Sequence, residues 1–185
     1  MSGNVDRRVR RTRQAIQRAL VELILEKGYE PATVTDLIDR ADVGRSTFYA
    51  HFTDKQAVLF SSLDELAFLR PAPSGDGPLF AFSLPMFEHV AEQRRLVRAL
   101  LGRRGGKAVI TRSEQILAGI VREELLARGA TASVSLDLTI TCVVGAFMAL
   151  ARTWADEEIT ATPAEIDAVF RATVGPGVAA TLGQS

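Results

Sequence analysis

Apolar residues recur every three or four positions along most of this chain, and no segment alternates convincingly between apolar and polar residues. A period of three to four is that of an amphipathic helix, so the pattern predicts an all-α protein. A first helix is expected over residues 6–27, followed by the helix-stopping Gly28. Its apolar stripe consists of Ile16, Leu20, Leu23 and Ile24.

Two short apolar runs separated by a polar turn follow, between Thr33 and Phe52. Thr33, with Asp36 three residues later, forms a Thr-x-x-acid variant of the capping box and predicts the start of a helix. The turn Asp42-Val43-Gly44 is expected to be sharp, because Asp tolerates a left-handed backbone and Gly adopts one readily.

The second run predicts a helix over residues 45–51 with two different faces. Phe48 and Phe52, four residues apart, are expected on the core side, and the polar residues mostly on the other. A buried helix, a sharp turn and a second helix with a polar outer face are typical of a helix-turn-helix that enters the major groove of DNA.

The rest of the chain also has helical periodicity. The segment Pro71–Pro78, rich in Pro and Gly, is expected to be a loop and the natural domain boundary. Gly175-Pro176-Gly177 is expected to kink or break the last helix. Helices are predicted over residues 54–69, 84–92, 94–101, 107–128, 134–157 and 163–182.

Charge is distributed unevenly, although the formal net charge of the whole chain is zero. A neutral chain would by itself argue against nucleic acid as a partner, but a basic arm beside a helix-turn-helix is typical of a DNA-binding domain. A solvated run of charges is the alternative interpretation. Residues 7–18 contain no acid and six arginines: Arg7, Arg8, Arg10, Arg11, Arg13 and Arg18.

Candidate catalytic and metal-binding patterns are lacking in the sequence. Cys142 is the only cysteine, which excludes an intramolecular disulfide, and its apolar neighbours predict a small buried side chain rather than a redox sensor. The two histidines and this cysteine are far apart in sequence and suggest neither a metal site nor a catalytic triad. Gly105-Gly106-Lys107-Ala108 lacks the first Gly and the final Ser or Thr of a phosphate-binding loop. We therefore expect no cofactor, no metal and no enzyme activity.

Membrane targeting is not expected either. No apolar core follows the N-terminal arginines, as a secretory signal would require. The longest apolar stretch, Leu138–Ala151, is shorter than the roughly 20 residues that cross a bilayer. These features predict a cytoplasmic protein without a membrane partner.

Three segments, in this order and spacing, resemble the tetracycline-repressor (TetR) family of bacterial regulators. They are Gly28-Tyr29-Glu30-Pro31-Ala32-Thr33-Val34, Thr47-Phe48-Tyr49-Ala50-His51-Phe52 and Thr53-Asp54-Lys55. The resemblance implies a helix-turn-helix DNA-binding domain of three helices, assigned to residues 1–55, and a C-terminal helical bundle for ligand binding and dimerisation, assigned to residues 56–185.

Candidate DNA contacts fall into two groups. Arg45 and Ser46 open the second helix of the motif, whose N-terminal residues meet base edges, and Arg45 can hold a guanine through two hydrogen bonds. Phosphate contacts, which position the protein, are assigned to Thr33, Thr35, Thr47, Tyr49, His51 and Lys55. The alternatives are packing for Tyr49 and helix capping for Thr33.

The resemblance also implies a pocket for a small inducer in the C-terminal bundle. His89 and Arg98 are candidate polar anchors of this pocket, although either can simply be a solvated residue. An aromatic stripe at helical spacing is more often ordinary core than a pocket wall. The candidate pocket residues are Phe68, Phe82, Phe87, His89, Met148 and Trp154.

A homodimer is expected because the last two helices carry more apolar residues than one small bundle needs to bury. A helix lying on a membrane surface is the alternative, but basic residues do not line its polar face. The residues assigned to the dimer interface are Ile140, Val144, Phe147, Ala151, Val169 and Phe170.

The sequence thus predicts a homodimeric regulator that binds a palindromic DNA operator and is released by a small hydrophobic or amphipathic inducer, most simply a repressor. A DNA-binding protein of the same fold without a ligand is the first alternative, and an all-helical enzyme is the second.

Overall fold

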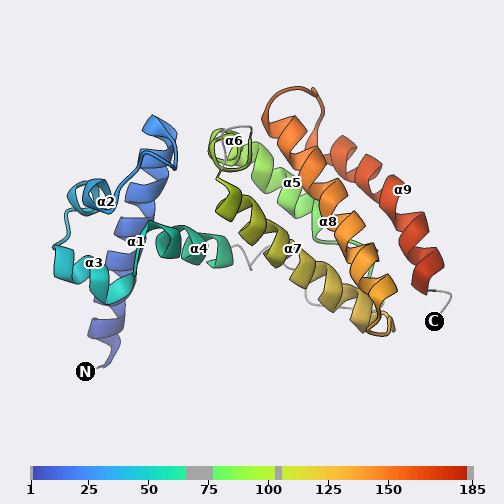
Figure 1. Ribbon diagram of the computed structural model, residues 1–185, viewed down its shortest axis with the longest axis horizontal. Coiled ribbons are helices and arrows are strands. Elements are labelled where there is room, and N and C mark those ends of the chain that lie inside the picture. Colours follow the sequence, from blue (N-terminus) through green and yellow to red (C-terminus); the bar gives the residue numbers. More distant parts are fainter. Residues whose placement is uncertain (1, 66–76, 103–105, 183–185) are drawn as a thin grey trace.

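The computed structural model describes residues 2–65, 77–102 and 106–182, and all regular structure in these ranges is helical. The all-α prediction is therefore confirmed. Figure 1 shows α1–α3 at one end of the molecule and α9 at the other. The helices are α1 (Ser2–Lys27), α2 (Val34–Ala41), α3 (Arg45–His51), α4 (Lys55–Glu65), α5 (Ser83–Glu92), α6 (Arg94–Leu101), α7 (Lys107–Ala127), α8 (Val134–Ala155) and α9 (Pro163–Leu182).

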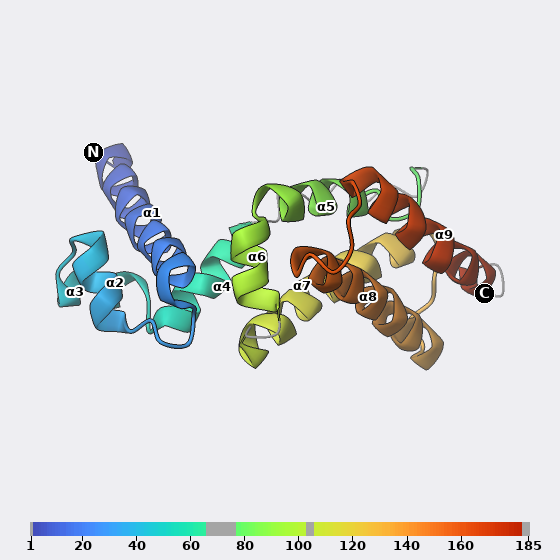
Figure 2. The ribbon, with the colours of Figure 1, turned by 90° about the horizontal axis from the view of Figure 1, so that it is seen from above.

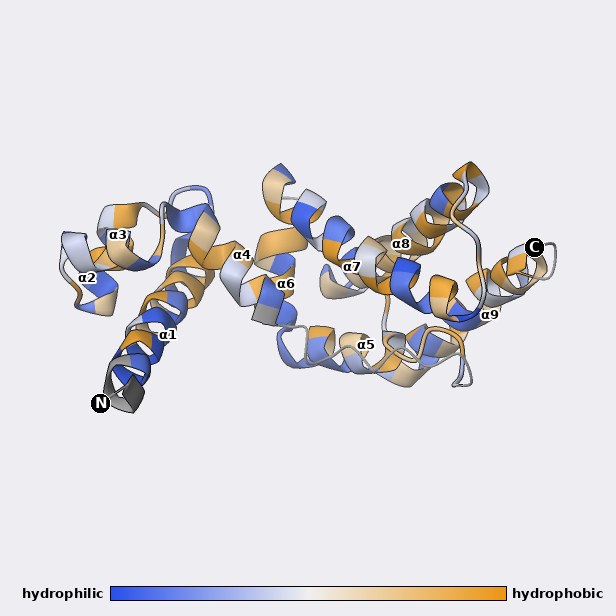
Figure 3. Ribbon diagram, turned by 90° about the horizontal axis from the view of Figure 1, so that it is seen from below, coloured by the Kyte–Doolittle hydropathy of each residue, from blue (hydrophilic) through white to orange (hydrophobic). Residues whose placement is uncertain are grey.

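A first hydrophobic core, which we call the N-terminal cluster, joins α1 to α2, α3 and α4. It also includes Leu100 from α6 and Val109 from α7, so the two halves of the molecule share it. Figure 3 shows hydrophobic residues gathered in the C-terminal half of α1 and hydrophilic residues near its start. The cluster consists of Ile16, Ala19, Leu20, Leu23, Ile24, Tyr29, Ala32, Leu37, Phe48, Phe52, Val58, Leu59, Leu100 and Val109.

The position of α4 bears on the domain division. Its residues Val58 and Leu59 are buried in the N-terminal cluster, while α4 also packs against α7. In Figure 2, α6 lies between α4 and the remaining helices. Helix α4 thus packs against both parts of the molecule, and the division after residue 55 stays a prediction.

A second hydrophobic core, the C-terminal cluster, lies between α5, α7, α8 and α9 and is rich in aromatic rings. The Phe87 and Phe147 rings stack with centroids 4.5 Å apart, and the edge of one ring meets the face of the other between Phe147 and Phe170, 5.6 Å apart. Such pairs add about 0.5–1.5 kcal/mol to the burial of the rings. Its largest members are Phe80, Phe82, Phe87, Phe147, Met148, Trp154 and Phe170.

This core corrects the predicted dimer interface. Val169 is 56% exposed, but the other five residues assigned to that interface lie inside the protomer. Large apolar residues of α8 and α9 turn inward because the aromatic core requires their volume. The five buried residues are Ile140, Val144, Phe147, Ala151 and Phe170.

Three further expectations differ from the structure. Helix α1 begins at Ser2 rather than near residue 6, so the helix extends further toward the N-terminus than predicted. Helix α9 continues through Pro176, so the proline costs the helix one backbone hydrogen bond but does not end it. Cys142 is exposed, because it lies on the side of α8 that faces away from the C-terminal cluster.

Candidate nucleic-acid interface

Helix α2 begins with the capping box that the sequence predicts. The Thr33 hydroxyl oxygen accepts a hydrogen bond from the Asp36 backbone N–H at 3.1 Å, and the Thr33 N–H donates to Asp36 Oδ2 at 2.7 Å. The Thr33 hydroxyl proton is also donated to Asp36 Oδ2, at 2.6 Å. Because its proton already has an acceptor, Thr33 fits the capping alternative better than a phosphate donor.

The turn between α2 and α3 depends on Asp42 rather than on Gly44. Asp42 is left-handed, with φ 50° and ψ 52°, while Gly44 has an extended backbone with φ −71°. The Val43 N–H then donates to the Ile38 carbonyl at 3.2 Å, which closes the end of α2. The turn therefore places the first residue of α3, Arg45, directly after a short extended segment.

Helix α3 has the two faces that the spacing predicts. Phe48 is fully buried and Phe52 is 5% exposed, and their rings lie 6.2 Å apart in the N-terminal cluster. The core assignment of both residues is confirmed. Tyr49 is 51% exposed, and its ring meets Phe48 only by an edge contact. Helix α3 thus packs against the N-terminal cluster through its aromatic side, and its opposite side is exposed to solvent.

Most of the predicted DNA contacts are exposed, either at the start of α2 or along α3. Within the ranges that the structure describes, no hydrogen bond or ion pair engages the side chain of Arg45, Ser46 or Thr47. The guanidinium and two hydroxyls therefore remain available to another molecule. The residues of the set that are exposed are Thr33, Thr35, Arg45, Ser46, Thr47 and Tyr49, and His51 is half-buried.

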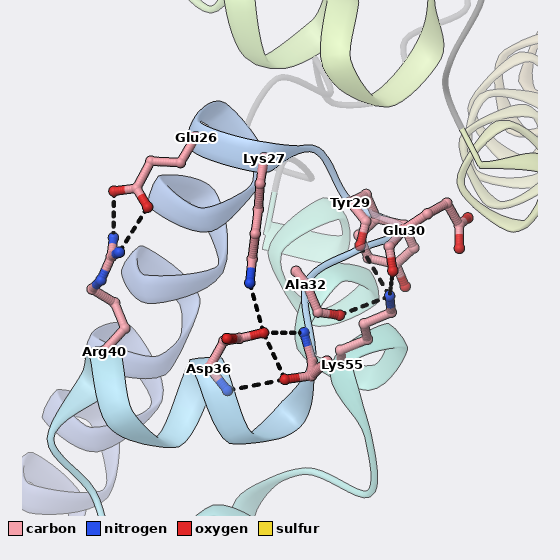
Figure 4. Close-up of polar contacts among 9 residues, drawn as sticks. Glu26, Lys27, Tyr29, Glu30, Ala32, Asp36, Arg40 and Lys55 are labelled. Atoms are coloured by element: carbon pink, nitrogen blue, oxygen red, sulfur yellow. Dashed lines mark hydrogen bonds and ion pairs between the residues drawn. The ribbon is translucent and has the colours of Figure 1, made fainter.

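Lys55 has a different role from the one predicted. Its ammonium donates hydrogen bonds to the backbone carbonyls of Tyr29, Glu30 and Ala32, each at 2.9 Å (Figure 4). The nitrogen also lies 4.5 Å from the centroid of the Tyr29 ring. Three carbonyls occupy the three protons of an ammonium, so the phosphate contact predicted for this side chain does not fit the structure. We reassign Lys55 as a positioning residue for the turn between α1 and α2.

Ion pairs hold α2 against the end of α1. The Lys27 ammonium lies 2.8 Å from Asp36 Oδ2, and Arg40 binds Glu26 through two nitrogens, at 2.8 and 2.7 Å (Figure 4). The hydrogen bond from Lys27, followed by those from Thr33, holds the pKa of Asp36 well below its usual range. The Arg40 hydrogen bond likewise lowers the pKa of Glu26. The orientation of α2 is thus set by charge as well as by burial.

The N-terminal arginines lie near the proposed DNA-facing end. Figures 1 and 2 show the start of α1 at the same end of the molecule as α3. Arg7, Arg8, Arg10 and Arg11 are exposed. Arg13 instead binds the body of the domain, since it donates to Ser61 Oγ at 3.0 Å and lies 4.6 Å from the Phe52 ring centroid.

Comparisons with known proteins agree with this geometry. The family model described as "Bacterial regulatory proteins, tetR family" matches residues 16–61, which include α2 and α3. The HTH-type transcriptional regulator TcmR of Streptomyces glaucescens is 40% identical over 86 residues, which cover 44% of this chain and 38% of that relative. These matches support a TetR-family transcriptional regulator.

Other relatives are matched over shorter segments of the chain. YxbF of Bacillus subtilis, an uncharacterized HTH-type transcriptional regulator, is 39% identical over 56 residues, or 30% of this chain and 15% of that relative. This chain therefore spans well under half the length of the curated relatives that it matches.

Solved structures share the fold over nearly the whole chain. A TetR transcriptional regulator from Streptococcus agalactiae has a TM-score of 0.72 at 22% identity, covering 94% of this chain and 99% of that chain. NalD, described as the secondary repressor of the MexAB-OprM multidrug efflux pump in Pseudomonas aeruginosa, has a TM-score of 0.64 at 18% identity, covering 91% of this chain and 96% of that chain. The tetR-family fold thus extends beyond the matched N-terminal segment.

The structure places a cavity of about 340 Å³ where α1, α4, α5, α6, α7 and α8 meet. Of the predicted pocket residues, His89 and Met148 line it. Burial lowers the pKa of the His89 imidazole, with a smaller opposing effect from Glu92. A neutral imidazole offers one hydrogen-bond donor and one acceptor to a cavity whose other walls are mostly apolar.

The remaining predicted pocket residues lie elsewhere. Phe82, Phe87 and Trp154 do not line this cavity; they pack in the C-terminal cluster, and the Trp154 indole donates to the Ala161 carbonyl at 3.0 Å. Arg98 pairs with Asp156 at 3.7 Å and with Glu157 at 3.6 Å. The sequence does not distinguish core from cavity wall, and these four assignments to a ligand pocket stay predictions. Phe68 lies outside the described residues.

Sequence reasoning missed the contribution of α1 to this cavity. Leu20, Val21 and Ile24 form part of its wall. One signal was present in the sequence, because Val21 lies beside the main apolar stripe of α1 and widens it toward a second neighbour.

Proposed function

We propose that this tetR-family chain is a homodimeric, ligand-responsive transcriptional repressor that acts in the cytoplasm on a palindromic DNA operator and is released by a small inducer. The observation that carries the proposal is the exposed side of α3, where Arg45, Ser46 and Thr47 have no partner within the described residues while Phe48 anchors the opposite side. A rigid helix with free polar side chains is what major-groove reading requires.

Contacts to DNA would divide between bases and phosphates. Arg45 and Ser46, in the first turn of α3, would meet base edges, and Arg45 is long enough to hold a guanine through two hydrogen bonds. Thr35, Thr47, Tyr49 and His51 would donate to phosphates. The side chains of Thr33 and Lys55 would act indirectly, by fixing α2 and the turn before it.

The outward sides of α8 and α9 support a homodimer in place of the buried residues first assigned to it. These sides are exposed and uncharged, with Leu138, Cys142 and Gly145 on α8 and Val169 and Ala172 on α9. A Cβ at Gly145 would meet no other atom within 4 Å, so packing inside the protomer does not require a glycine there. A second copy approaching closely around a two-fold axis would explain this small and apolar surface.

Helix α8 is also long and apolar enough to cross a membrane, by length and composition alone. Its larger residues pack in the C-terminal cluster, and its smaller residues form the proposed dimer face. One side packed in the C-terminal cluster and one in the proposed dimer would explain the high apolar content of α8, so membrane insertion is not needed to explain it.

Ligand response and repression rest on two further observations. The cavity beside α1 and α4 has the volume of a small-molecule site. The structural neighbour NalD is described as a repressor, which supports the same direction of control here. An inducer would act by binding more tightly to a conformation whose two α3 helices are wrongly spaced for the operator.

Selection of DNA from a random pool by the purified chain tests the proposal. We expect enrichment of palindromes whose half-sites lie about one helical turn or slightly more apart. Sedimentation of the complex should give two protomers on each selected duplex. Enrichment of no sequence, or one protomer on a single unpaired site, would contradict it.

A further inference from the structure

Helix α7 takes part in both hydrophobic cores. Val109, near its start, lies in the N-terminal cluster, whereas Leu117 and Val121 further along lie in the C-terminal cluster. Figure 1 shows α7 running from the neighbourhood of α4 away from α1, α2 and α3. Because the later part of α7 is packed in the bundle, its first turns form a fixed surface against which the DNA-binding helices lie.

Neither backbone strain nor capping explains the glycine at the start of α7. Gly106 is the N-cap residue and has an extended backbone, with φ −72° and ψ 134°, which any residue can adopt. It cannot make a side-chain capping bond, although Ser, Thr, Asp and Asn are preferred at this position because their side chains satisfy a free N–H group. The reason for a glycine must therefore lie in its surroundings.

The turn between α1 and α2 approaches Gly106 closely. A Cβ at Gly106 would lie 2.8 Å from Glu30 Oε1 and 3.5 Å from the Tyr29 ring. Glu30 is exposed and its side chain points away from Lys55 (Figure 4), so its carboxylate can rotate aside. The Tyr29 ring cannot, because it is only 7% exposed and the Lys55 ammonium lies 4.5 Å from its centroid. Helix α7 thus begins in contact with a firmly held part of this turn.

Arg112, less than two turns further along α7, contacts α4. Its Nη2 lies 2.7 Å from Asp64 Oδ1, and its guanidinium lies 5.5 Å from the centroid of the Phe60 ring, close enough for a cation–π interaction. Helix α6 also meets the N-terminal cluster, but through apolar residues such as Leu96 and Leu100. Apolar burial has no preferred direction, whereas an ion pair and a ring contact restrict the angle between the two helices.

Gly106, Val109 and Arg112 lie on one side of α7, because they follow each other at intervals of three residues. We call these three residues the α7 contact stripe. They meet three different parts of the DNA-binding half: the turn between α1 and α2, the N-terminal cluster, and α4. Contacts at three separate points fix both the tilt and the rotation of one body on another.

We propose that the α7 contact stripe, through Gly106 and Arg112, sets the orientation of the DNA-binding helices on the C-terminal bundle and thereby determines which half-site spacing the dimer selects. This inference rests on the homodimer and the palindromic operator of the proposed function. A dimer holds its two bundles in a fixed relation, so a rotation of each DNA-binding half on α7 changes the distance between the two α3 helices. Gly106 and Arg112 are thus positioning residues that do not contact DNA.

Spin-label distances within one protomer test the orientation. The labels are attached to Asp39→Cys on α2 and Glu123→Cys on α7, both at exposed positions, in a Cys142→Ser background that has no other cysteine. Dilution with unlabelled chain leaves only distances within a protomer. The measurement requires neither DNA nor a second labelled copy, and the unsubstituted background should give one narrow distance distribution.

Two substitutions at Gly106 should differ in their effect. Gly106→Val adds methyl groups about 1.5 Å beyond the Cβ, closer to the Tyr29 ring than the roughly 3.5–4.0 Å at which carbons pack. The mean distance should therefore shift. Gly106→Ala should leave it unchanged, since only the exposed end of Glu30 must move, and Ala108→Val adds the same side chain at an exposed position of α7 as a control. An unchanged mean in Gly106→Val would overturn the proposal.

A matched pair of arginine substitutions tests the second contact. Arg112→Met removes the ion pair with Asp64 and should broaden the distance distribution. Arg122→Met removes an ion pair with Asp137, 2.6 Å long, that joins α7 to α8 inside the bundle, and should not. Circular dichroism verifies folding, and this pair decides the outcome if Gly106→Val does not fold. Equal distributions in the two arginine variants would overturn the role of Arg112.

Selection of DNA from a random pool, repeated with Gly106→Val and Arg112→Met, tests the spacing. We expect the same half-site sequence as for the unsubstituted chain, because α3 is unchanged, but a different or wider range of half-site spacings. Weaker binding with an unchanged spacing would reduce both residues to a structural role and overturn the inference. If the unsubstituted chain selects no palindrome, the proposed function is overturned, and the spin-label distances still decide whether α7 orients the DNA-binding helices.

Discussion

The Lys55 ammonium lies 2.9 Å from the carbonyl oxygen of Tyr29 and 4.5 Å from the centroid of its ring. With its bonds to Glu30 and Ala32, it fixes the backbone that leads into α2. A residue near the candidate DNA surface is thus used to hold the protein's own backbone. Substitutions can distinguish side chains that contact DNA from side chains that only hold the DNA-contacting helices in position.

Lys55→Met should destabilise the DNA-binding domain. The substitution keeps much of the aliphatic stem but leaves three carbonyls without their charged donor, and we expect a loss of about 1.5 kcal/mol, the low end for such bonds at a partly exposed site. Urea unfolding measures the change. Lys107→Met, at an exposed position of α7, is the matched control and should change stability by less than about 0.5 kcal/mol. Equal effects would refute the positioning role.

Tyr49→Phe should weaken binding to operator and non-operator DNA alike. Its hydroxyl is proposed to donate to a phosphate, and one neutral hydrogen bond contributes about 0.5–1.5 kcal/mol, or roughly two- to twelvefold in affinity. Fluorescence anisotropy with both DNAs provides the test. Tyr29→Phe removes the same atom from a buried ring and should leave DNA affinity unchanged. A Tyr49→Phe protein with full affinity would show that the hydroxyl does not contact DNA.

Arg45→Lys should relax sequence preference at one base pair of each half-site. A lysine keeps the positive charge but cannot form the paired hydrogen bonds that an arginine makes with guanine, which discriminate by about 1–3 kcal/mol. The dependence of affinity on salt should stay the same, because the number of cations is unchanged. A uniform loss across all sequences would instead assign Arg45 to the phosphates.

Gly145→Leu should convert the proposed dimer to a monomer without unfolding it. A side chain at Gly145 meets no atom within 4 Å in the protomer, but it would clash with a second copy that packs on α8. Gly119→Leu on α7, also free of neighbours within 4 Å, is the matched control and should remain dimeric. Light scattering gives the mass of each. If the Gly145 variant stays dimeric with full operator affinity, the interface lies elsewhere.

Asp36 should make stability depend on pH in the acid range. Lys27 and Thr33 lower the pKa of Asp36 in the folded protein from the ordinary value of 3.8. Its contribution to the free energy of unfolding is therefore complete above about pH 5 and declines as the pH falls further. Asp36→Asn should lose this part of the pH dependence. Asp39→Asn is the control on the same helix, since its side chain makes no hydrogen bond within the described ranges. Identical pH profiles for the original chain and Asp36→Asn would contradict the linkage.

Local patterns in the sequence determined the helix-turn-helix. The Thr33–Asp36 cap, the left-handed Asp42 and the inward Phe48 all follow from residues no more than four positions apart, and each is confirmed. Capping and helical periodicity act over one turn, so they can be read from neighbouring residues alone. The same local rules predicted the order and approximate bounds of the later helices.

Only the tertiary structure decided how these helices use their surfaces. Helix α8 is apolar on two sides, and the packing of Phe147 against Phe87 turned its larger residues inward and left Gly145 outside. Lys55 finds its carbonyls more than twenty residues earlier in the chain, and the cavity gathers α1 with α8. Such contacts depend on which distant segments meet. Helical periodicity predicts which side of a helix is apolar, but it does not predict which other helix packs against that side.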